Sequence, residues 1–189
     1  MILGFTGTFG SGKTTIADYL KAKGFQFITI SDLVREEARK RGLSIERKVL
    51  QDIGNEMRER YGVGFWAKKV LEKINKETDC VVDGIRNPGE IEELRKVPGF
   101  VLLSFDAPVE ERLKRLVDKE GVRKERADSD PTDVKEIRRL EVRDRGEGEP
   151  LFGQQVGRCM EMADFKVETN QGVEFTLEEI EKIIDLNKK

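Results

Sequence analysis

One stretch of the sequence, GTFGSGKTT at residues 7–15, constrains the fold more than any other. It satisfies the pattern G-x-x-x-x-G-K-[ST] and follows the apolar run ILGFT at 2–6. It leads into a segment in which Ile16 and Leu20 lie four residues apart, the spacing of one helix face. A strand that enters a glycine-rich turn and leaves it as a helix is the opening unit of a parallel α/β sheet.

Further apolar runs predict four more β-strands, at 25–30, 80–84, 100–106 and 165–169. Most of them are nearly continuous in apolar residues, which is typical of parallel strands covered on both faces. Helical patterns lie between these runs, at 13–23, 31–41, 44–61, 63–76, 90–96, 108–119, 130–145 and from 176 onward. This alternation predicts a three-layer α/β fold with a five-stranded parallel sheet and right-handed crossovers.

Helix starts can be predicted from side chains that accept backbone hydrogen bonds. Ser31 is the expected N-cap of the second helix, and TLEE, beginning at Thr176, has the spacing of a capping box for the last helix.

The length of 189 residues suits a single domain over 1–189. Two segments interrupt the strand–helix rhythm: an almost purely helical one at 31–77 and a strongly charged one at 120–149. We expect both to lie over the carboxyl edge of the sheet, where α/β folds bind ligands. The core is then predicted to consist of 1–30, 78–120 and 150–189.

Composition excludes several classes of protein. Lysine plus arginine (35) nearly balance aspartate plus glutamate (37), and direct nucleic-acid binding usually needs a positive excess. No apolar run approaches the roughly 20 residues of a membrane span, and MILGFTG has no basic signal-peptide region. Cys80 and Cys159 belong to no ligand-spaced cluster and are predicted to be reduced. We therefore expect a cytoplasmic protein, monomeric or homodimeric.

The glycine stretch predicts phosphate binding, because its backbone N–H groups and the following helix N-terminus favour an anion. Lys13 would reach the β- and γ-phosphates as a catalytic cation, and the Thr14 hydroxyl would ligate Mg²⁺. A purely structural glycine turn is the alternative. The predicted cofactors are ATP and Mg²⁺, with GTP left open as the nucleotide. The predicted nucleotide ligands are Gly7, Thr8, Phe9, Gly10, Ser11, Gly12, Lys13, Thr14 and Thr15.

Charged residues follow the second and third predicted strands. VVDGIR places Asp83 where a magnesium-binding acid follows a strand, with Arg86 three residues on. SDLVRE places Asp32 and Arg35 at the start of the next helix. Helix capping also explains Asp32, and a turn cap also explains Asp83. The guanidinium groups of Arg35 and Arg86, at one edge of the sheet, can bind the phosphate of a second substrate by paired hydrogen bonds. A Ras-type GTPase is excluded, because NKETD at 75–79 has its aspartate one place too late.

Two further motifs follow along the chain, RLKR at 112–115 and the later RADSDPTDVKEIRRL. Taken together, the motifs resemble those of the nucleoside monophosphate kinase superfamily, which includes adenylate kinase and dephospho-coenzyme A kinase. The resemblance implies that 31–77 binds the acceptor and that 120–149 is a short lid. It implies acceptor binding by Arg35 and Arg86, beside Asp32 and Asp83. It also implies a donor-base contact by Arg112 and catalytic lid roles for Arg126 and Arg139.

A closer similarity covers nearly the whole chain. DLVREEARKRG, GNEMRERYG and DGIRNPGE are similar to uncharacterised archaeal kinase-like proteins and to the kinase-like region of some deoxycytidylate deaminases. The sequence departs from adenylate kinase in three respects. DGIR lacks the proline and one residue of D-G-F-P-R, the RLKR arginines are three rather than four apart, and the lid carries no cysteine set. AMP is therefore not carried over as the acceptor.

The predicted function is ATP-dependent phosphoryl transfer to a phosphate-bearing small molecule such as a nucleoside or deoxynucleoside monophosphate. An anionic acceptor oxygen needs no general base, which suits a chain without histidine. One alternative is a hydroxyl acceptor of the dephospho-coenzyme A type, with Asp32 or Asp83 as base. Another is an ATP-binding regulatory protein or ATPase with little kinase activity.

Overall fold

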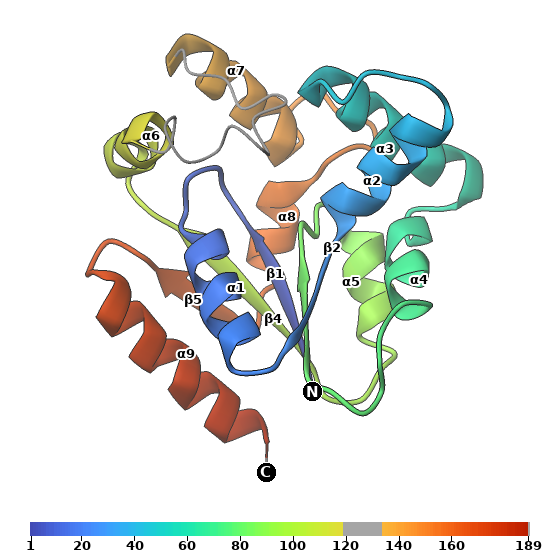
Figure 1. Cartoon of the computed structure of the whole chain (residues 1–189). Coiled ribbons are helices and arrows are strands. Elements are labelled where there is room, and N and C mark those ends of the chain that lie inside the picture. The colour runs from blue at the N-terminus through green and yellow to red at the C-terminus, as the bar shows by residue number, and fades with distance from the viewer. Residues whose placement is uncertain (119–133, 189) are drawn as a thin grey trace.

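In the computed structural model, which describes residues 1–118 and 134–188, five parallel strands form one sheet in the order β2-β3-β1-β4-β5 (Figure 1). The strands are β1 (Ile2–Gly7), β2 (Gln26–Thr29), β3 (Cys80–Asp83), β4 (Phe100–Asp106) and β5 (Phe165–Glu168). The predicted α/β class and the five-stranded parallel sheet are confirmed, and each strand lies within its predicted run except that β1 extends to Gly7.

Helices cover both faces of the sheet. The described helices are α1 (Lys13–Ala22), α2 (Ile30–Lys40), α3 (Arg47–Tyr61), α4 (Phe65–Leu71), α5 (Pro88–Leu94), α6 (Val109–Asp118), α7 (Val134–Arg145), α8 (Val156–Glu161) and α9 (Val173–Asn187). Helices α1 and α9 lie on one face and α4, α5 and α8 on the other, whereas α2, α3, α6 and α7 lie towards the edge where β1 ends (Figure 1).

The core is split into two layers by the alternation of side chains along each strand. Leu3 and Phe5 of β1 pack with α1 and α9, whereas Ile2 packs in the other cluster, with α2 to α5 and α8. On β3, Val81 faces the first cluster and Val82 the second. Strand side chains that are apolar in both directions require helices on both faces, which is the predicted three-layer arrangement.

The register of the sheet brings three chain segments together. Phe5 of β1 pairs with Asp83 of β3, and Asp83 pairs with Thr29 of β2. The glycine loop after β1, the acid that ends β3 and the start of α2 therefore share the carboxyl edge of the sheet. This is the edge at which parallel α/β folds place their ligands.

Two predicted helix starts are wrong. The N-cap of α2 is Thr29, whose hydroxyl accepts a hydrogen bond from the backbone N–H of Ser31 at 3.2 Å, so Ser31 is already helical. Helix α9 begins at Val173 after Gly172, whose φ of 97° turns the chain. Thr176 lies within its first turn and donates to the Gly172 carbonyl at 2.8 Å, so it cannot be the cap. Helix α8 was not predicted from the sequence.

Helix α5 carries a capping box that sequence analysis did not identify. The Asn87 side chain accepts from the N–H of Gly89 at 2.9 Å, and the Glu90 carboxylate accepts from the N–H of Asn87 at 3.1 Å. The Asn87 amide also donates to the carbonyl oxygens of Leu151 (2.9 Å) and Gly153 (2.8 Å). This side chain thus begins α5 and holds the 151–153 segment against it.

No helix within residues 1–118 and 134–188 is long and apolar enough to cross a membrane.

We predict that Asn87→Ala lowers the free energy of unfolding by about 2 to 3 kcal/mol, because it removes a helix cap and leaves the carbonyl groups of Leu151 and Gly153 without this donor. Urea denaturation followed by circular dichroism measures this change. Asn170→Ala, at an exposed asparagine, is the control and should cost less than about 0.5 kcal/mol. Equal effects of the two substitutions would contradict the assigned role of Asn87.

Candidate active site

The glycine stretch forms a turn between β1 and α1 that only glycine fits at its key positions. Gly7, Gly10 and Gly12 have φ values of 132°, 70° and 83°, in the region that side chains disfavour. A Cβ atom at Gly7 would overlap the carbonyl oxygen of Phe105, and one at Gly10 would lie 2.6 Å from the carbonyl oxygen of Arg112. The loop therefore lies tightly against β4 and α6.

The ammonium group of Lys13 lies inside this turn. It donates to the carbonyl oxygens of Gly7 (3.0 Å) and Thr8 (2.7 Å) and to the Ser11 hydroxyl (3.0 Å). Desolvation lowers the pKa of Lys13 to about 8, although the negative charge of Asp83 acts in the opposite direction. A cation held by neutral oxygens is stabilised by an incoming anion, so the loop is suited to a phosphate group.

The Asp83 carboxylate lies at the end of β3 and lines the same cavity as Lys13 and Thr14. Its Oδ1 atom is buried and has no hydrogen-bond partner among the residues the structure describes. A buried carboxylate oxygen without a partner is costly, and a cation or a bound water would satisfy it. Within the described ranges no three acidic, cysteine or histidine side chains cluster as metal ligands. This donor set fits Mg²⁺, which takes few protein ligands and keeps waters and phosphate oxygens.

The cavity in front of the glycine loop has a volume of about 240 Å³ and continues beneath α2 and α3. It brings together Gly7 to Thr14 and all four predicted acceptor residues: Asp32, Arg35, Asp83 and Arg86. Thr15 is exposed and does not line it.

Asp32 and Arg35 form an ion pair on the first turns of α2. The guanidinium of Arg35 donates to the Asp32 carboxylate at 2.9 Å, and the Asp32 side chain is 60% exposed. An exposed pair of this kind contributes little to stability. It does keep a guanidinium at the cavity wall, and it shows that Asp32 does not cap the helix.

Arg86 is held at both its backbone and its side chain. Its N–H donates to Glu90 at 2.8 Å, and its guanidinium donates to Asp144 at 2.9 Å and to Gln154 at 3.2 Å. These partners come from α5, α7 and the segment before α8, so the position of Arg86 depends on three parts of the chain.

Three further cavity residues were not identified from the sequence: Arg47 and Gln51 of α3 and Asp144 of α7. Arg47 donates to Asp144 at 2.9 Å, and its guanidinium carbon lies 3.6 Å from the centre of the Phe9 ring, a cation–π contact. Gln51 donates to Asp144 at 2.7 Å. The sequence signal is weak, because Arg47 and Asp144 each lie in a run of mixed charges that resembles a solvated helix face.

A buried ion pair supports the acceptor side of the cavity. Arg58 of α3 donates to Glu90 of α5 at 2.8 Å, and the two side chains are 2% and 0% exposed. The second oxygen of Glu90 accepts the N–H groups of Arg86 and Asn87. Glu90 therefore fixes α3 and the Arg86 segment relative to each other.

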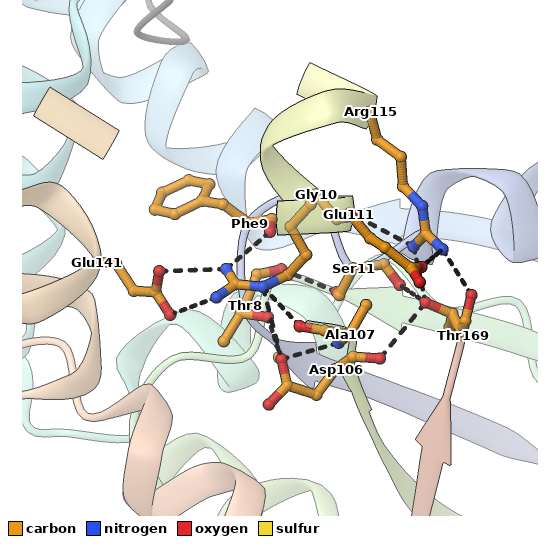
Figure 2. Close-up of polar contacts among 12 residues, drawn as sticks. Thr8, Phe9, Gly10, Ser11, Asp106, Ala107, Glu111, Arg115, Glu141 and Thr169 are labelled. Atoms are coloured by element: carbon orange, nitrogen blue, oxygen red, sulfur yellow. Dashed lines mark hydrogen bonds and ion pairs between the residues drawn. The ribbon is translucent and has the colours of Figure 1, made fainter. Parts of the chain in front are cut away.

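Arg112, the predicted donor-base contact, is largely enclosed. Its guanidinium donates to both oxygens of Glu141, at 3.0 and 3.1 Å, and to the carbonyl oxygen of Phe9 at 3.1 Å; Glu141 and Phe9 are labelled in Figure 2. It also donates to the Ala107 carbonyl at 2.9 Å, and its side chain is 3% exposed. In this arrangement Arg112 supports the outer side of the glycine loop. Contact with a base stays a prediction, and it requires the pair with Glu141 to open.

Arg115 is the more accessible of the two arginines in this network. Its guanidinium donates to the hydroxyl and carbonyl oxygens of Thr169, at 2.8 and 2.6 Å, and reaches the Gly10 carbonyl at 3.4 Å (Figure 2).

The predicted lid arginines are not brought to the cavity in the part of the chain that is described. Arg139 is exposed on α7 and does not line the cavity. Arg126 lies outside the described residues, so its role stays a prediction.

We predict that Glu90→Ala lowers the free energy of unfolding by about 3 to 5 kcal/mol, because it leaves the buried guanidinium of Arg58 without a counter-ion. Chemical denaturation measures the change. Glu92→Ala, an exposed glutamate on the same helix, is the matched control and should change stability by less than about 0.5 kcal/mol. A loss below about 1 kcal/mol for Glu90→Ala would contradict the assigned role.

The AAA domain family matches residues 3–145 of the chain. A UPF0200/UPF0201 protein of Archaeoglobus fulgidus is 37% identical over 189 residues, which cover 97% of this chain and 54% of that protein. A UPF0200 protein of Pyrococcus abyssi is 30% identical over 191 residues, which cover 97% of this chain and 95% of that protein. The chain thus spans about half the length of the first relative, and 64% of a UPF0200 protein of Sulfurisphaera tokodaii.

Solved structures share the fold at low sequence identity. TT1252 of Thermus thermophilus aligns with a TM-score of 0.64 and 20% identity, covering 100% of this chain and 98% of that one. Shikimate kinase of Aquifex aeolicus aligns with a TM-score of 0.53 and 20% identity over the same shares of the two chains.

The resemblance to archaeal kinase-like proteins is thus confirmed, and the sheet order and helix layers are those of a P-loop kinase-like fold. Because the family match spans most of the sequence and the Pyrococcus relative is covered almost completely, this chain belongs to the AAA domain family and to the UPF0200 proteins.

Proposed function

We propose that this protein transfers the γ-phosphoryl group of ATP to a phosphate-bearing small molecule, a nucleoside or deoxynucleoside monophosphate being the best candidate. The observation that carries the proposal is one cavity with a phosphate-binding loop on one side and guanidinium groups on the other. Lys13 faces it from the loop, and Arg35 and Arg86 face it from α2 and the end of β3.

On the donor side, the proposed nucleotide ligands are the backbone N–H groups of the loop from Gly7 to Thr15 and the ammonium of Lys13. Thr14 and Asp83 are the residues that would hold Mg²⁺, and the buried Oδ1 of Asp83 supports that role. When bound, the metal supplies positive charge that neutralises phosphate oxygens.

On the acceptor side, Arg35 and Arg86 would hold the phosphate of the second substrate by charge-assisted hydrogen bonds. An ionised phosphate oxygen is already a nucleophile, so positioning and positive charge supply the catalysis and no general base is needed. The absence of histidine from the sequence is consistent with this mechanism. Arg126 and Arg139 remain the proposed lid arginines.

A hydroxyl acceptor is the second candidate. The observation that favours it is the carboxylate of Asp32, which lines the cavity and is 60% exposed, so a base is available to take a hydroxyl proton.

The test is transfer of label from γ-labelled ATP and Mg²⁺ to a panel of acceptors, with Lys13→Ala as the inactive control. The panel contains all ribo- and deoxynucleoside monophosphates and dephospho-coenzyme A. Label in a monophosphate supports the proposal, and label in dephospho-coenzyme A supports the hydroxyl alternative. Release of label only as phosphate, equally with and without every acceptor, would contradict kinase activity and favour an ATP-binding regulatory protein.

We predict that Arg86→Lys lowers kcat/KM for the acceptor roughly 100-fold with little change in KM for ATP, because lysine cannot reproduce a planar guanidinium. Steady-state kinetics with the acceptor found in the panel measures the effect. Arg95→Lys, at an arginine 41% exposed on the C-cap of α5, is the matched control and should leave both constants within about twofold. A rise in KM for ATP alone would place Arg86 on the donor side.

The lowered pKa of Lys13 predicts a pH dependence of nucleotide binding. The charged ammonium binds phosphate, so binding above pH 8 requires proton uptake. The contribution of Lys13 to the affinity for ATP should be constant below about pH 8. Above that pH the affinity should fall by up to about tenfold per pH unit. Calorimetry in buffers of different ionisation enthalpy measures the proton uptake. Lys13→Met should bind more weakly and without this pH dependence. An uptake of zero at pH 9 in the wild type would be inconsistent with the prediction.

A further inference from the structure

Asp144 occupies the acceptor side of the cavity from an unexpected direction. It lies near the end of α7, within the predicted lid segment 120–149, yet its side chain is only 8% exposed and lines the cavity. Its Oδ2 atom accepts from Arg47 and from Arg86, both at 2.9 Å, and its Oδ1 atom accepts from Gln51 at 2.7 Å. One carboxylate is thus the meeting point of α3, α7 and the segment after β3.

The donors around this carboxylate form a site for an oxyanion. N–H groups from separate guanidinium groups converge on one oxygen, and an amide N–H reaches the other. Guanidinium groups recognise carboxylate and phosphate by the same planar hydrogen-bonding geometry. A phosphate monoester offers three terminal oxygens, so it can accept from every donor that now binds Asp144.

The neighbours of Arg47 hold its guanidinium between the glycine loop and Asp144. It lies over the ring of Phe9, which belongs to the glycine loop, while its Nη2 atom points to Asp144. Arg47 therefore reaches from α3 to both the loop that is proposed to bind ATP and the carboxylate that also holds Arg86. Neither a purely structural surface pair nor a remote positioning residue has this placement.

From these contacts we infer that Asp144 is an internal substitute for the acceptor, and that Arg47 is a further acceptor-binding residue. The carboxylate holds Arg47 and Arg86 in place and leaves them when the phosphate monoester of the acceptor enters. This inference rests on the proposed function for the identity of the oxyanion. The inference goes beyond the proposed function in two respects. It assigns Arg47, Gln51 and Asp144 to the acceptor site, and it makes the acceptor compete with Asp144 for the same donors.

The experiment measures binding of inorganic phosphate by calorimetry to the full chain, with the glycine loop filled by the non-hydrolysable analogue AMP-PNP and Mg²⁺. The titration is repeated without nucleotide in a Lys13→Met background, so that phosphate bound at the loop is excluded. Asp144→Asn should bind phosphate about tenfold more tightly than the reference protein, because the competing charge is gone. Arg47→Gln should bind about tenfold more weakly.

Asp52→Asn is the matched control. Like Asp144, Asp52 pairs with an arginine across α3 and α7, but it does not line the cavity. This substitution should change phosphate affinity by less than twofold. Unchanged or weaker binding of both phosphate and acetate by folded Asp144→Asn would overturn the inference, since that result is expected of a purely structural carboxylate. If Asp144→Asn does not fold, Arg47→Lys decides: affinity equal to that of the unaltered protein overturns the inference, and a loss supports it.

A parallel titration with acetate separates the inference from the proposed function. Tighter binding of phosphate by Asp144→Asn, with no change in its affinity for acetate, supports both the inference and the proposed function. The same tightening seen for acetate but not for phosphate supports the oxyanion site and contradicts a phosphate-bearing acceptor. Transfer to a monophosphate in the labelled panel together with no effect of Asp144→Asn contradicts the inference alone.

Discussion

The ion pair and hydrogen bonds of the buried Glu90 carboxylate hold together the side of the cavity that is proposed to bind the acceptor. The carboxylate is completely buried, and each of its oxygens accepts hydrogen bonds: one from Arg58, the other from the N–H groups of Arg86 and Asn87. A buried charge of this kind is stable only when it is paired and fully hydrogen-bonded. The Glu90 carboxylate can therefore be buried only when its donors are in place, and these come from α3, the segment after β3 and the start of α5.

That constraint explains how Arg86 is placed precisely although it follows a short loop. Its backbone is held by Glu90 from below, while Gln155, just before α8, donates its N–H to the Arg86 carbonyl at 2.6 Å. The guanidinium is then the only part of the residue that can exchange partners without disturbing the fold. A binding site that uses this side chain can lose and regain an anion at little structural cost.

Helix α7 connects the two sides of the cavity through side chains one turn apart. Glu141 holds Arg112, which donates to the Phe9 carbonyl of the glycine loop, and Asp144 holds Arg47 and Arg86. The Phe9 ring lies beneath Arg47, so the two networks touch at that residue. Helix α7 therefore contacts the glycine loop through Arg112 and the residues proposed to bind the acceptor through Asp144.

The fold and the nucleotide loop could be predicted because their signals are local: apolar runs of strand length, and glycines that only a tight turn requires. The residues that line the cavity were predicted in part, since Asp83 ends a strand and Arg86 lies three residues beyond it. Arg47 and Asp144 were missed because partners 97 residues apart leave no pattern in either charged helix. Arg112 shows the opposite difficulty, because the family resemblance implies a ligand contact while its environment is that of a buried ion pair.

Two unmet requirements of the loop side point to the same kind of ligand. The ammonium of Lys13 is desolvated among neutral oxygens, which lowers its pKa, and the buried Oδ1 of Asp83 lacks a donor within the described residues. Direct pairing of Lys13 with Asp83 would satisfy both, but the ammonium instead bonds the loop's own oxygens. A ligand that carries both phosphate oxygens and a cation satisfies both groups at once, whereas a simple anion satisfies only the first. These two groups thus support the proposal that a metal-bound nucleotide, rather than a free phosphate, occupies this loop.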